Sequence, residues 1–231
     1  MKIIGLVGGM SWESSLEYYR LINRGVRERL GGLHSAQLAL VSVDFATIAA
    51  LQHEGRWDEL GAMLAGEAAR LKAAGAAFCV IATNTMHLVA DRIEAEAGLP
   101  VLHIADAAGA ELARRGVRQV GLLGTRFTME QPFYAARLAT GFGIETLIPD
   151  EADRAELHRI IYDELVQGRI EPASRATVGA IMARLAGRGA GAILLACTEL
   201  GLLVADGDAR VPLLDTTALH AVAAVEASLA G

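Results

Sequence analysis

Residues 71–85 read Leu-Lys-Ala-Ala-Gly-Ala-Ala-Phe-Cys-Val-Ile-Ala-Thr-Asn-Thr, and residues 185–199 read Leu-Ala-Gly-Arg-Gly-Ala-Gly-Ala-Ile-Leu-Leu-Ala-Cys-Thr-Glu. These stretches align without a gap at an offset of 114 residues, so that Thr83 meets Cys197. Each contains a glycine typical of a helix C-terminus, followed by an apolar run typical of a buried strand and by a polar turn. The alignment predicts two equivalent helix–strand–loop segments in one chain.

Two shorter matches occur in the same order along the chain. Residues 4–8 match residues 120–124 at an offset of 116, and residues 100–102 match residues 212–214 at an offset of 112. A common order with a nearly constant offset favours the duplication of one α/β half. The alternative is chance similarity, because a chain rich in glycine and alanine aligns easily with itself.

Apolar runs and helical patterns alternate along the whole chain. The apolar runs lie at residues 3–7, 38–43, 78–82, 100–104, 119–123, 144–148, 192–196 and 211–214. Several are continuous, which is typical of strands buried on both faces of a parallel sheet. Helical patterns cover residues 57–73, 154–167 and 13–29, the last with Leu16, Tyr19, Ile22 and Val26 on one expected apolar stripe.

This alternation predicts an α/β fold with two pseudo-symmetric domains, each a mostly parallel sheet flanked by helices. We expect the first domain to comprise residues 1–98 plus 208–231 and the second to comprise residues 99–207. Ligands of open parallel sheets bind beyond the carboxyl ends of the strands. The loops of Thr83 and Cys197 are therefore expected to face one active site in the cleft between the domains.

Composition excludes several classes of protein. Hydrophobic residues make up 53% of the 231 residues and charged residues 21%, which excludes a disordered chain. The net charge is −6 and there is no basic block, so we expect no nucleic-acid partner and no anionic-membrane partner. The charge-free run between Lys72 and Asp91 contains Asn84 and His87, so it indicates a strand and loop instead of a membrane span. The N-terminal run resembles a first strand and not a signal peptide, which predicts a cytoplasmic protein.

The glycines and cysteines give little support for a bound cofactor. Gly5, Gly8 and Gly9 do not form a dinucleotide-binding fingerprint, and no P-loop motif is present, so we expect no cofactor. Two separate cysteines build neither a disulfide framework nor a four-ligand zinc site. His87 and His220 are interpreted as structural residues more readily than as metal ligands.

The two cysteines stand in different surroundings. Cys79 lies inside an apolar run and is expected to be inert, whereas Cys197 stands between a strand and the polar Thr198 and is expected to be reactive. The alternative for Cys197 is a small buried hydrophobic residue. Thr83, Asn84 and Thr85 also fit a simple turn and helix N-cap, a role that would not exclude catalysis.

Three motifs together resemble the aspartate/glutamate racemase family over essentially the whole chain. They are Thr-Asn-Thr-Met-His at residues 83–87, Ala-Cys-Thr-Glu-Leu at residues 196–200 and Gly-Gly-Met-Ser-Trp-Glu-Ser-Ser at residues 8–15. The resemblance implies a PLP-independent isomerase with two pseudo-symmetric α/β domains, which forms a homodimer. It also implies a pair of residues flanking the substrate Cα, one from each domain. The pair is usually two cysteines; here it would be Thr83 and Cys197, as in a subset of similar amino-acid racemases.

The same resemblance implies a set of substrate contacts. These are Gln52, expected in the loop after the second strand, together with Met10, Asn84, Thr85, Thr125 and Thr198. Many aspartate racemases place basic residues against the substrate carboxylates. Here Ile48 and Glu164 stand where basic residues would be expected, so the identity of the amino acid stays open.

The chemistry of the pair suggests how a proton would move. A free cysteine titrates near ~8.5 and a helix N-terminus lowers this value, so we expect Cys197 to supply a thiolate base near neutral pH. The Thr83 hydroxyl is a poor base but can return a proton to a carbanion, which predicts modest net racemisation of aspartate or glutamate. Two alternatives are a single-thiol lyase or isomerase, such as a decarboxylase, and a binding protein for amino acids or dicarboxylates that has lost turnover.

Overall fold

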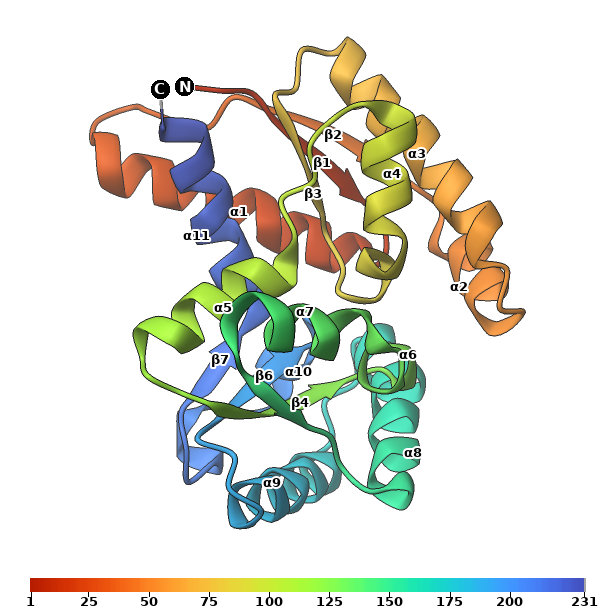
Figure 1. Ribbon diagram of the computed structural model, residues 1–231, viewed down its shortest axis with the longest axis vertical. Helices are drawn as coiled ribbons and strands as arrows, with labels where there is room; N and C mark the ends of the chain where they lie inside the picture. Colours follow the sequence, from red (N-terminus) through yellow and green to blue (C-terminus); the bar gives the residue numbers. More distant parts are fainter. Residues whose placement is uncertain (231) are drawn as a thin grey trace. The chain divides into compact units, whose positions relative to one another are not determined.

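The computed structural model describes residues 1–230, which form an α/β protein (Figure 1). Its strands are β1 (Ile4–Gly8), β2 (Leu38–Ser42), β3 (Phe78–Ile81), β4 (Gln119–Gly124), β5 (Glu145–Leu147), β6 (Ala192–Ala196) and β7 (Leu213–Asp215). The helices of the first part of the chain are α1 (Trp12–Leu30), α2 (Phe45–His53), α3 (Trp57–Ala73), the 3₁₀ helix η1 (Thr85–Val89), α4 (Ala90–Ala97) and α5 (Ile104–Arg114). Those that follow are α6 (Arg126–Glu130), α7 (Pro132–Phe142), α8 (Glu151–Arg159), α9 (Pro172–Gly187), α10 (Leu200–Leu203), the short turn η4 (Asp206–Asp208) and α11 (Thr216–Leu229).

The chain divides into two compact units. The first unit comprises Met1–Ile104 together with the segment that begins at His220, and the second comprises Ala105–Leu219. The chain passes from the first unit to the second after Ile104 and returns at His220, in both cases later than the expected boundaries at residues 98 and 208. Strand pairing explains both shifts, because Val101 bridges to Cys79 of β3 and β7 pairs with β6. Residue 231 of the expected first domain lies outside the described residues.

The first unit has a three-stranded parallel sheet in the order β2-β1-β3. Side chains alternate across it: Val7 and Ile81 pack with α3 and α4 on one face, whereas Leu6 and Val80 pack with α1 and α11 on the other. Both faces of β1 and β3 are therefore buried, which explains the continuous apolar runs in the sequence.

The second unit has a four-stranded parallel sheet in the order β5-β4-β6-β7. Its β5-β4-β6 portion repeats the β2-β1-β3 order of the first unit, which confirms the expected α/β fold with two similar halves. The counterpart of β7 is reduced to the single bridge between Cys79 and Val101. The strand expected at residues 100–104 is therefore not formed, because α5 already begins at Ile104.

Two predicted helices differ from the observed ones. In α1 the buried apolar residues are Tyr18, Ile22 and Val26, whereas Leu16 and Tyr19 are 59% and 51% exposed. The expected stripe was therefore wrong for these two residues. Small side chains set the helix rotation, because the Ser15 hydroxyl accepts the Gly9 N–H at 2.7 Å and packs against the end of β1.

The second difference concerns the helix expected over residues 154–167. Helix α8 ends at Arg159, and the chain continues through the π-helical turn Ile160–Glu164 and the 3₁₀ turn Leu165–Gln167. The wider turn buries Ile160 and Ile161 side by side in the core of the second unit. The periodicity of the sequence predicted a helical path here but not its change of pitch.

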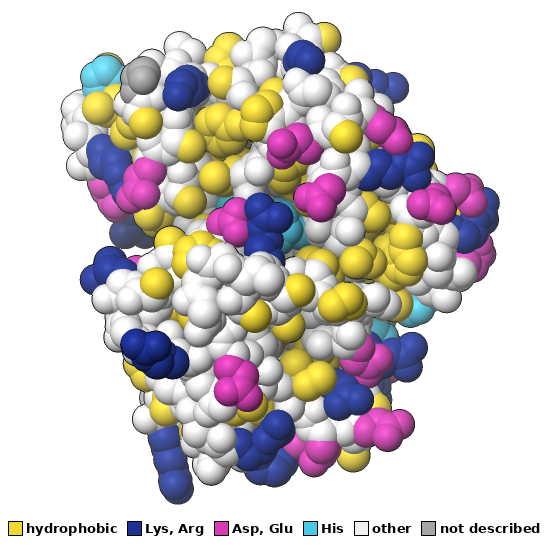
Figure 2. All heavy atoms as spheres, in the orientation of Figure 1, with side chains coloured by type: hydrophobic (Ala, Val, Ile, Leu, Met, Phe, Trp, Pro, Cys, Tyr) yellow, Lys and Arg dark blue, Asp and Glu magenta, His cyan; other side chains and the backbone are white. Residues whose placement is uncertain are grey.

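Charged side chains of both signs are interspersed on the face drawn in Figure 2. Many charged side chains of the described residues form local ion pairs, such as Arg56–Glu59 at 2.5 Å and Arg92–Glu96 at 2.6 Å. Pairs of this exposed kind contribute little to stability. Within residues 1–230, no helix combines the length and the hydropathy that crossing a bilayer requires.

We expect Gly9→Ala to destabilise the protein by about 3 kcal/mol, because it combines backbone strain with overpacking. Gly9 has φ of +91°, and a Cβ at this position would collide with the backbone of Val43. Urea denaturation of the variant measures the loss. The matched control is Gly143→Ala, at a left-handed helix C-cap where φ is also positive but no atom lies near the added methyl group. Its cost should be about 1 kcal/mol, and equal costs for the two variants would contradict the collision.

Candidate active site

Two loops of the first unit carry most of its expected site residues. Met10 follows β1, and Thr83, Asn84 and Thr85 follow β3. Because the strands are parallel neighbours with Val7 paired to Ile81, both loops leave the same edge of the sheet. Thr83 is half-buried, whereas Met10, Asn84 and Thr85 are buried.

Gln52 lies inside helix α2 and not in a loop, which corrects the expectation from the sequence. It is buried, and its Nε2 donates to the Met86 sulfur at 3.1 Å. Ile48 of the same helix is fully buried, in the apolar cluster of the first unit that also contains Met86. The position where a basic residue was expected is therefore part of the core.

The corresponding loops of the second unit carry Thr125, Cys197 and Thr198. Thr125 follows β4 and caps α6, since its hydroxyl oxygen accepts the Thr128 N–H at 3.3 Å. Cys197 and Thr198 follow β6. Gly124 pairs with Ala196, so Thr125 and Cys197 are the next residues at the same edge of the sheet. Cys197 thus occupies the place in its unit that Thr83 occupies in the other.

Glu199 is a further residue of this loop, and no role was predicted for it from the sequence. Its Oε2 accepts the Cys197 thiol at 3.1 Å and the Thr198 hydroxyl at 2.7 Å. Glu199 is buried although it carries a carboxylate. Its place two residues after Cys197 was the only signal of this contact in the sequence.

These surroundings keep the Cys197 thiol protonated. Burial raises the pKa of Cys197 well above its usual value, and the Glu199 carboxylate raises it further by its charge and by its hydrogen bond. Backbone N–H groups of Glu199 and Leu200 act in the opposite direction and are outweighed. The raised pKa runs against the expected thiolate near neutral pH, and α10, with four residues, is too short to reverse the balance.

The second cysteine is separate from this loop. Cys79 is fully buried within β3, and burial raises its pKa to about 12. Since a thiolate is the nucleophilic form, such a thiol is unreactive. Cys197, which is half-buried, is the more accessible of the two thiols.

Tyr162 interacts electrostatically with the loop that carries Cys197 and Glu199, and His158 packs against Tyr162. Burial raises the pKa of Tyr162 to about 12, and electrostatic interaction with Cys197 and Glu199 adds to this effect. The His158 ring packs against the Tyr162 ring with centroids 4.6 Å apart, and its Nδ1 accepts the Arg126 N–H at 3.2 Å. Neither residue was predicted from the sequence.

Glu164, where a basic residue was expected, is a buried acid with its own partners. Its Oε1 accepts from Arg159 at 2.8 Å, and its Oε2 accepts the Ser174 hydroxyl. The Ser174 hydrogen bond, followed by the Arg159 contacts, lowers the pKa of Glu164. This carboxylate is therefore held inside the second unit by local hydrogen bonds.

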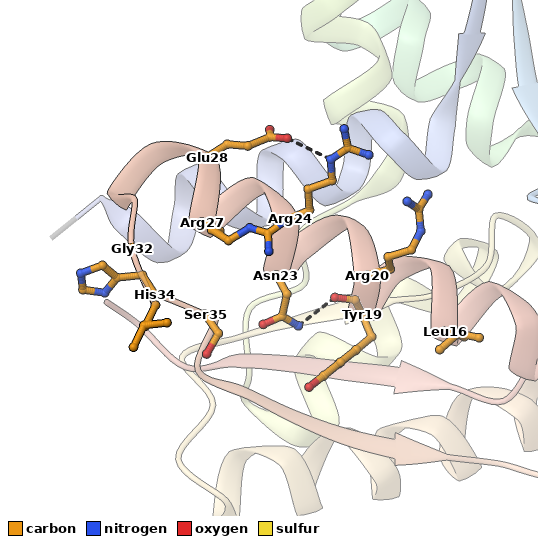
Figure 3. A pocket seen from close by; sticks show the side chains of 11 residues that line it. Leu16, Tyr19, Arg20, Asn23, Arg24, Arg27, Glu28, Gly32, His34 and Ser35 are labelled. Carbon is orange, nitrogen blue, oxygen red and sulfur yellow. Dashed lines mark hydrogen bonds and ion pairs between the residues drawn. The ribbon is translucent and has the colours of Figure 1, made fainter.

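A groove of the first unit lies along the exposed side of α1 and the loop at residues 32–35 (Figure 3). Arg24 pairs there with Glu28 at 2.9 Å, and the Asn23 amide donates to the Tyr19 carbonyl at 2.8 Å. None of the expected site residues lines this groove. Over the part of the chain that the structure describes, no group of three or more His, Cys, Asp or Glu side chains is arranged to hold a metal ion.

Comparison with known proteins gives the family. The model of the Asp/Glu/Hydantoin racemase family matches residues 7–224. The chain belongs to this racemase family. Membership supports an amino-acid racemase, which is an isomerase, as the activity of the chain.

Solved structures agree with this assignment. A candidate Asp/Glu racemase from Yersinia pestis is 51% identical, with a TM-score of 0.93 over 99% of this chain and 100% of that one. An aspartate racemase homologue from Pyrococcus horikoshii OT3 is 33% identical, with a TM-score of 0.84 over 99% of both chains. The aspartate racemase of Picrophilus torridus shares the racemase fold, with a TM-score of 0.74 and 18% identity over 99% of this chain and 94% of that one.

Proposed function

We propose that the chain racemises an acidic amino acid, aspartate or glutamate, without a cofactor, by proton transfer at Cα between Thr83 and Cys197. The observation that carries the proposal is the equivalence of the two positions, since each lies in the turn after the strand that pairs with the first strand of its unit. Thr83 offers a hydroxyl, and Cys197 offers a thiol that is hydrogen-bonded to Glu199. Two such groups, working from opposite faces of Cα, are what an inversion requires.

The proton transfers start from the protonated thiol. In the first step Glu199 takes the proton of Cys197, and the resulting thiolate removes the Cα proton of the substrate. The Thr83 hydroxyl then gives its proton to the opposite face of the carbanion. The proton held by Glu199 returns through solvent to the Thr83 oxygen, which restores the starting state with the former Cα proton on sulfur.

Thr83 limits the rate in this scheme because an alkoxide is a costly product of its proton transfer. The slow step affects both directions equally, since two enantiomers have the same free energy and kcat/KM must be equal for both. Exchange of the Cα proton on the Cys197 face is less restricted. We therefore expect solvent exchange at Cα to be faster than inversion.

The test is incubation of each enantiomer of aspartate and glutamate in D2O, followed by chiral chromatography and mass spectrometry. Inverted product that carries deuterium supports the proposal and identifies the amino acid. Deuterium without inversion would favour a single-thiol lyase or isomerase instead. Neither deuterium nor inversion for any of the four compounds would favour a binding protein.

Glu199→Gln tests the acid beside the thiol. Removing the negative charge takes away one cause of the raised pKa of Cys197, so the rise of kcat/KM with pH should move to lower pH. The amide cannot accept the thiol proton, so the plateau should fall by about tenfold or more. Racemisation measured across pH for wild type and variant checks both effects.

Glu111→Gln is the control for this variant, since Glu111 is a carboxylate of the same unit that pairs with Arg114 and Arg115. It should leave the pH profile unchanged. A Glu199→Gln enzyme with the wild-type profile and plateau would show that Glu199 takes no part in activating Cys197.

The homodimer and the cytoplasmic location stay part of the proposal. The outer side of α1 supports the homodimer, because Trp12, Leu16 and Tyr19 form an exposed apolar row with 66%, 59% and 51% of their surface accessible. Light scattering on the purified chain measures the oligomeric state, and a monomeric mass at working concentration would contradict the homodimer.

A further inference from the structure

Three buried histidines of the first unit pack against one another. His87 lies in η1, His103 lies just before α5, and His220 lies in α11. The His87 ring is central: its centroid is 4.6 Å from that of His103 and 5.5 Å from that of His220. All three are at most 4% exposed. The proposed proton transfers do not use them.

Hydrogen bonds define the tautomers of two of these rings. A carbonyl oxygen can only accept, so the 2.8 Å contact between His87 Nδ1 and the Thr83 oxygen requires a proton on Nδ1. His220 contacts the Leu102 oxygen through Nε2 at 2.7 Å, so its proton is on Nε2. Its Nδ1 then accepts the Tyr18 hydroxyl at 2.8 Å.

The surroundings of His87 keep its second nitrogen free of a proton. His87 Nε2 is buried and has no hydrogen-bond partner among the described residues. A proton there would leave an unsatisfied donor and a charge beside two further imidazoles. Burial lowers the pKa of His87 well below its ordinary value, and His103 and His220 lower it further. The remaining titratable group of the cluster is Tyr18, whose hydroxyl is hydrogen-bonded to His220.

His87 holds the turn that carries Thr83 in two ways. Its backbone N–H donates to the Asn84 carbonyl at 3.1 Å, and its side chain donates to the Thr83 carbonyl at 2.8 Å. The Thr83 N–H donates to the Ile81 carbonyl at 2.8 Å, which ties the turn to the end of β3. Both backbone polar groups of Thr83 are thus satisfied, one by the strand and one by His87.

We propose that His87 is a positioning residue for the Thr83 half-reaction. Its neutral imidazole, packed between His103 and His220, holds the Thr83 carbonyl and so fixes the hydroxyl of that residue for proton transfer. This inference rests on the proposed function. It adds that the two half-reactions depend on different neighbouring residues. His87 positions Thr83, whereas the Glu199 carboxylate accepts the proton of Cys197.

Two substitutions separate the hydrogen bond of His87 from its bulk. His87→Asn keeps an N–H donor near the place of Nδ1, whereas His87→Leu fills the site without a donor. Loss of one such hydrogen bond should lower kcat for inversion about tenfold in His87→Leu, with KM nearly unchanged. Exchange on the Cys197 face, measured in D2O without inversion, should keep its wild-type rate. His87→Asn should recover most of the inversion.

Ser228→Ala is the matched control, because the Ser228 hydroxyl is buried in the same unit and donates to the Lys2 carbonyl at 2.6 Å. The substitution removes a hydrogen bond from a side chain to a backbone carbonyl, at the end of the sheet opposite to Thr83. We expect a comparable loss of stability in urea with unchanged kcat for inversion. Nitrogen NMR of wild type gives a readout without substrate: His87 should stay protonated on Nδ1 alone as the pH falls from about 8 to about 6.

Several results would overturn the positioning role. These are full inversion by His87→Leu, equal loss of both half-reactions, no advantage of asparagine over leucine, or an NMR signal with the proton on Nε2. Inversion by wild type decides the proposed function separately, since its absence with all four amino acids would refute that function whatever the variants do. Inversion by wild type and by His87→Leu at equal rates would refute the inference alone.

Discussion

Replacing Cys197 with serine is expected to lower kcat for the inversion of either enantiomer by about 10³-fold, with little change in stability. A positioned acid–base group contributes typically about 10²–10⁴-fold, and a serine hydroxyl is far too weak an acid to replace a thiol in that role. The serine hydroxyl can still donate to Glu199, so the loop should keep its hydrogen bond. Chiral chromatography and thermal unfolding of the variant measure the two effects.

Cys79→Ala is the control for this experiment. Cys79 is fully buried in β3 and packs in the core of the first unit, so its loss leaves a small cavity. We expect a cost of about 1 kcal/mol in stability and wild-type turnover. Wild-type inversion by Cys197→Ser, or inactivity of a well-folded Cys79→Ala, would show that the proposed thiol is the wrong one.

Thr83→Cys is expected to raise the rate of inversion. A second thiol can act as a base on the face where threonine is weak, and each 1.36 kcal/mol removed from the barrier gives about tenfold in rate. The residue aligned with Glu199 is Thr85, so a thiol at position 83 would lack a carboxylate two residues ahead in the chain. The gain in kcat/KM must be the same for both enantiomers, because their equilibrium constant is unity.

The converse change is Thr83→Ala, which should lower inversion by about 10²-fold and keep deuterium exchange on the Cys197 face. Thr83→Ser is the matched control, because it retains the hydroxyl and should retain most of the inversion. If Thr83→Ala inverts its substrate as fast as wild type, the two-face mechanism fails for this chain. A single-thiol reaction would then explain the site better.

The places of Thr83 and Cys197 at the ends of their strands could be predicted because they depend only on residues nearby in the sequence. A buried strand followed by a polar turn is visible in the sequence, and the constant offset indicates that the two turns are equivalent. Helix α3 was predicted with its observed bounds, Trp57–Ala73, for the same reason. Gln52 was assigned to a loop because both faces of α2 carry apolar residues, so this short helix has no amphipathic signature.

Features that depend on burial or on distant contacts could not be predicted. The raised pKa of Cys197 follows chiefly from the loss of water around the thiol, which no motif reveals. The contact of His87 with His103 and His220 joins residues far apart in the sequence, so no spacing indicates it.

The first unit is interrupted by the second, and this has a consequence for synthesis on the ribosome. The segment that begins at His220 supplies Ala221, Ala224 and Val225 to the core that also contains Ile4 and Leu6 of β1. Translation completes the whole of residues 105–219 before this segment is made. The second unit can therefore fold co-translationally, while the face of the first sheet that α1 shares with α11 stays only partly covered until α11 emerges.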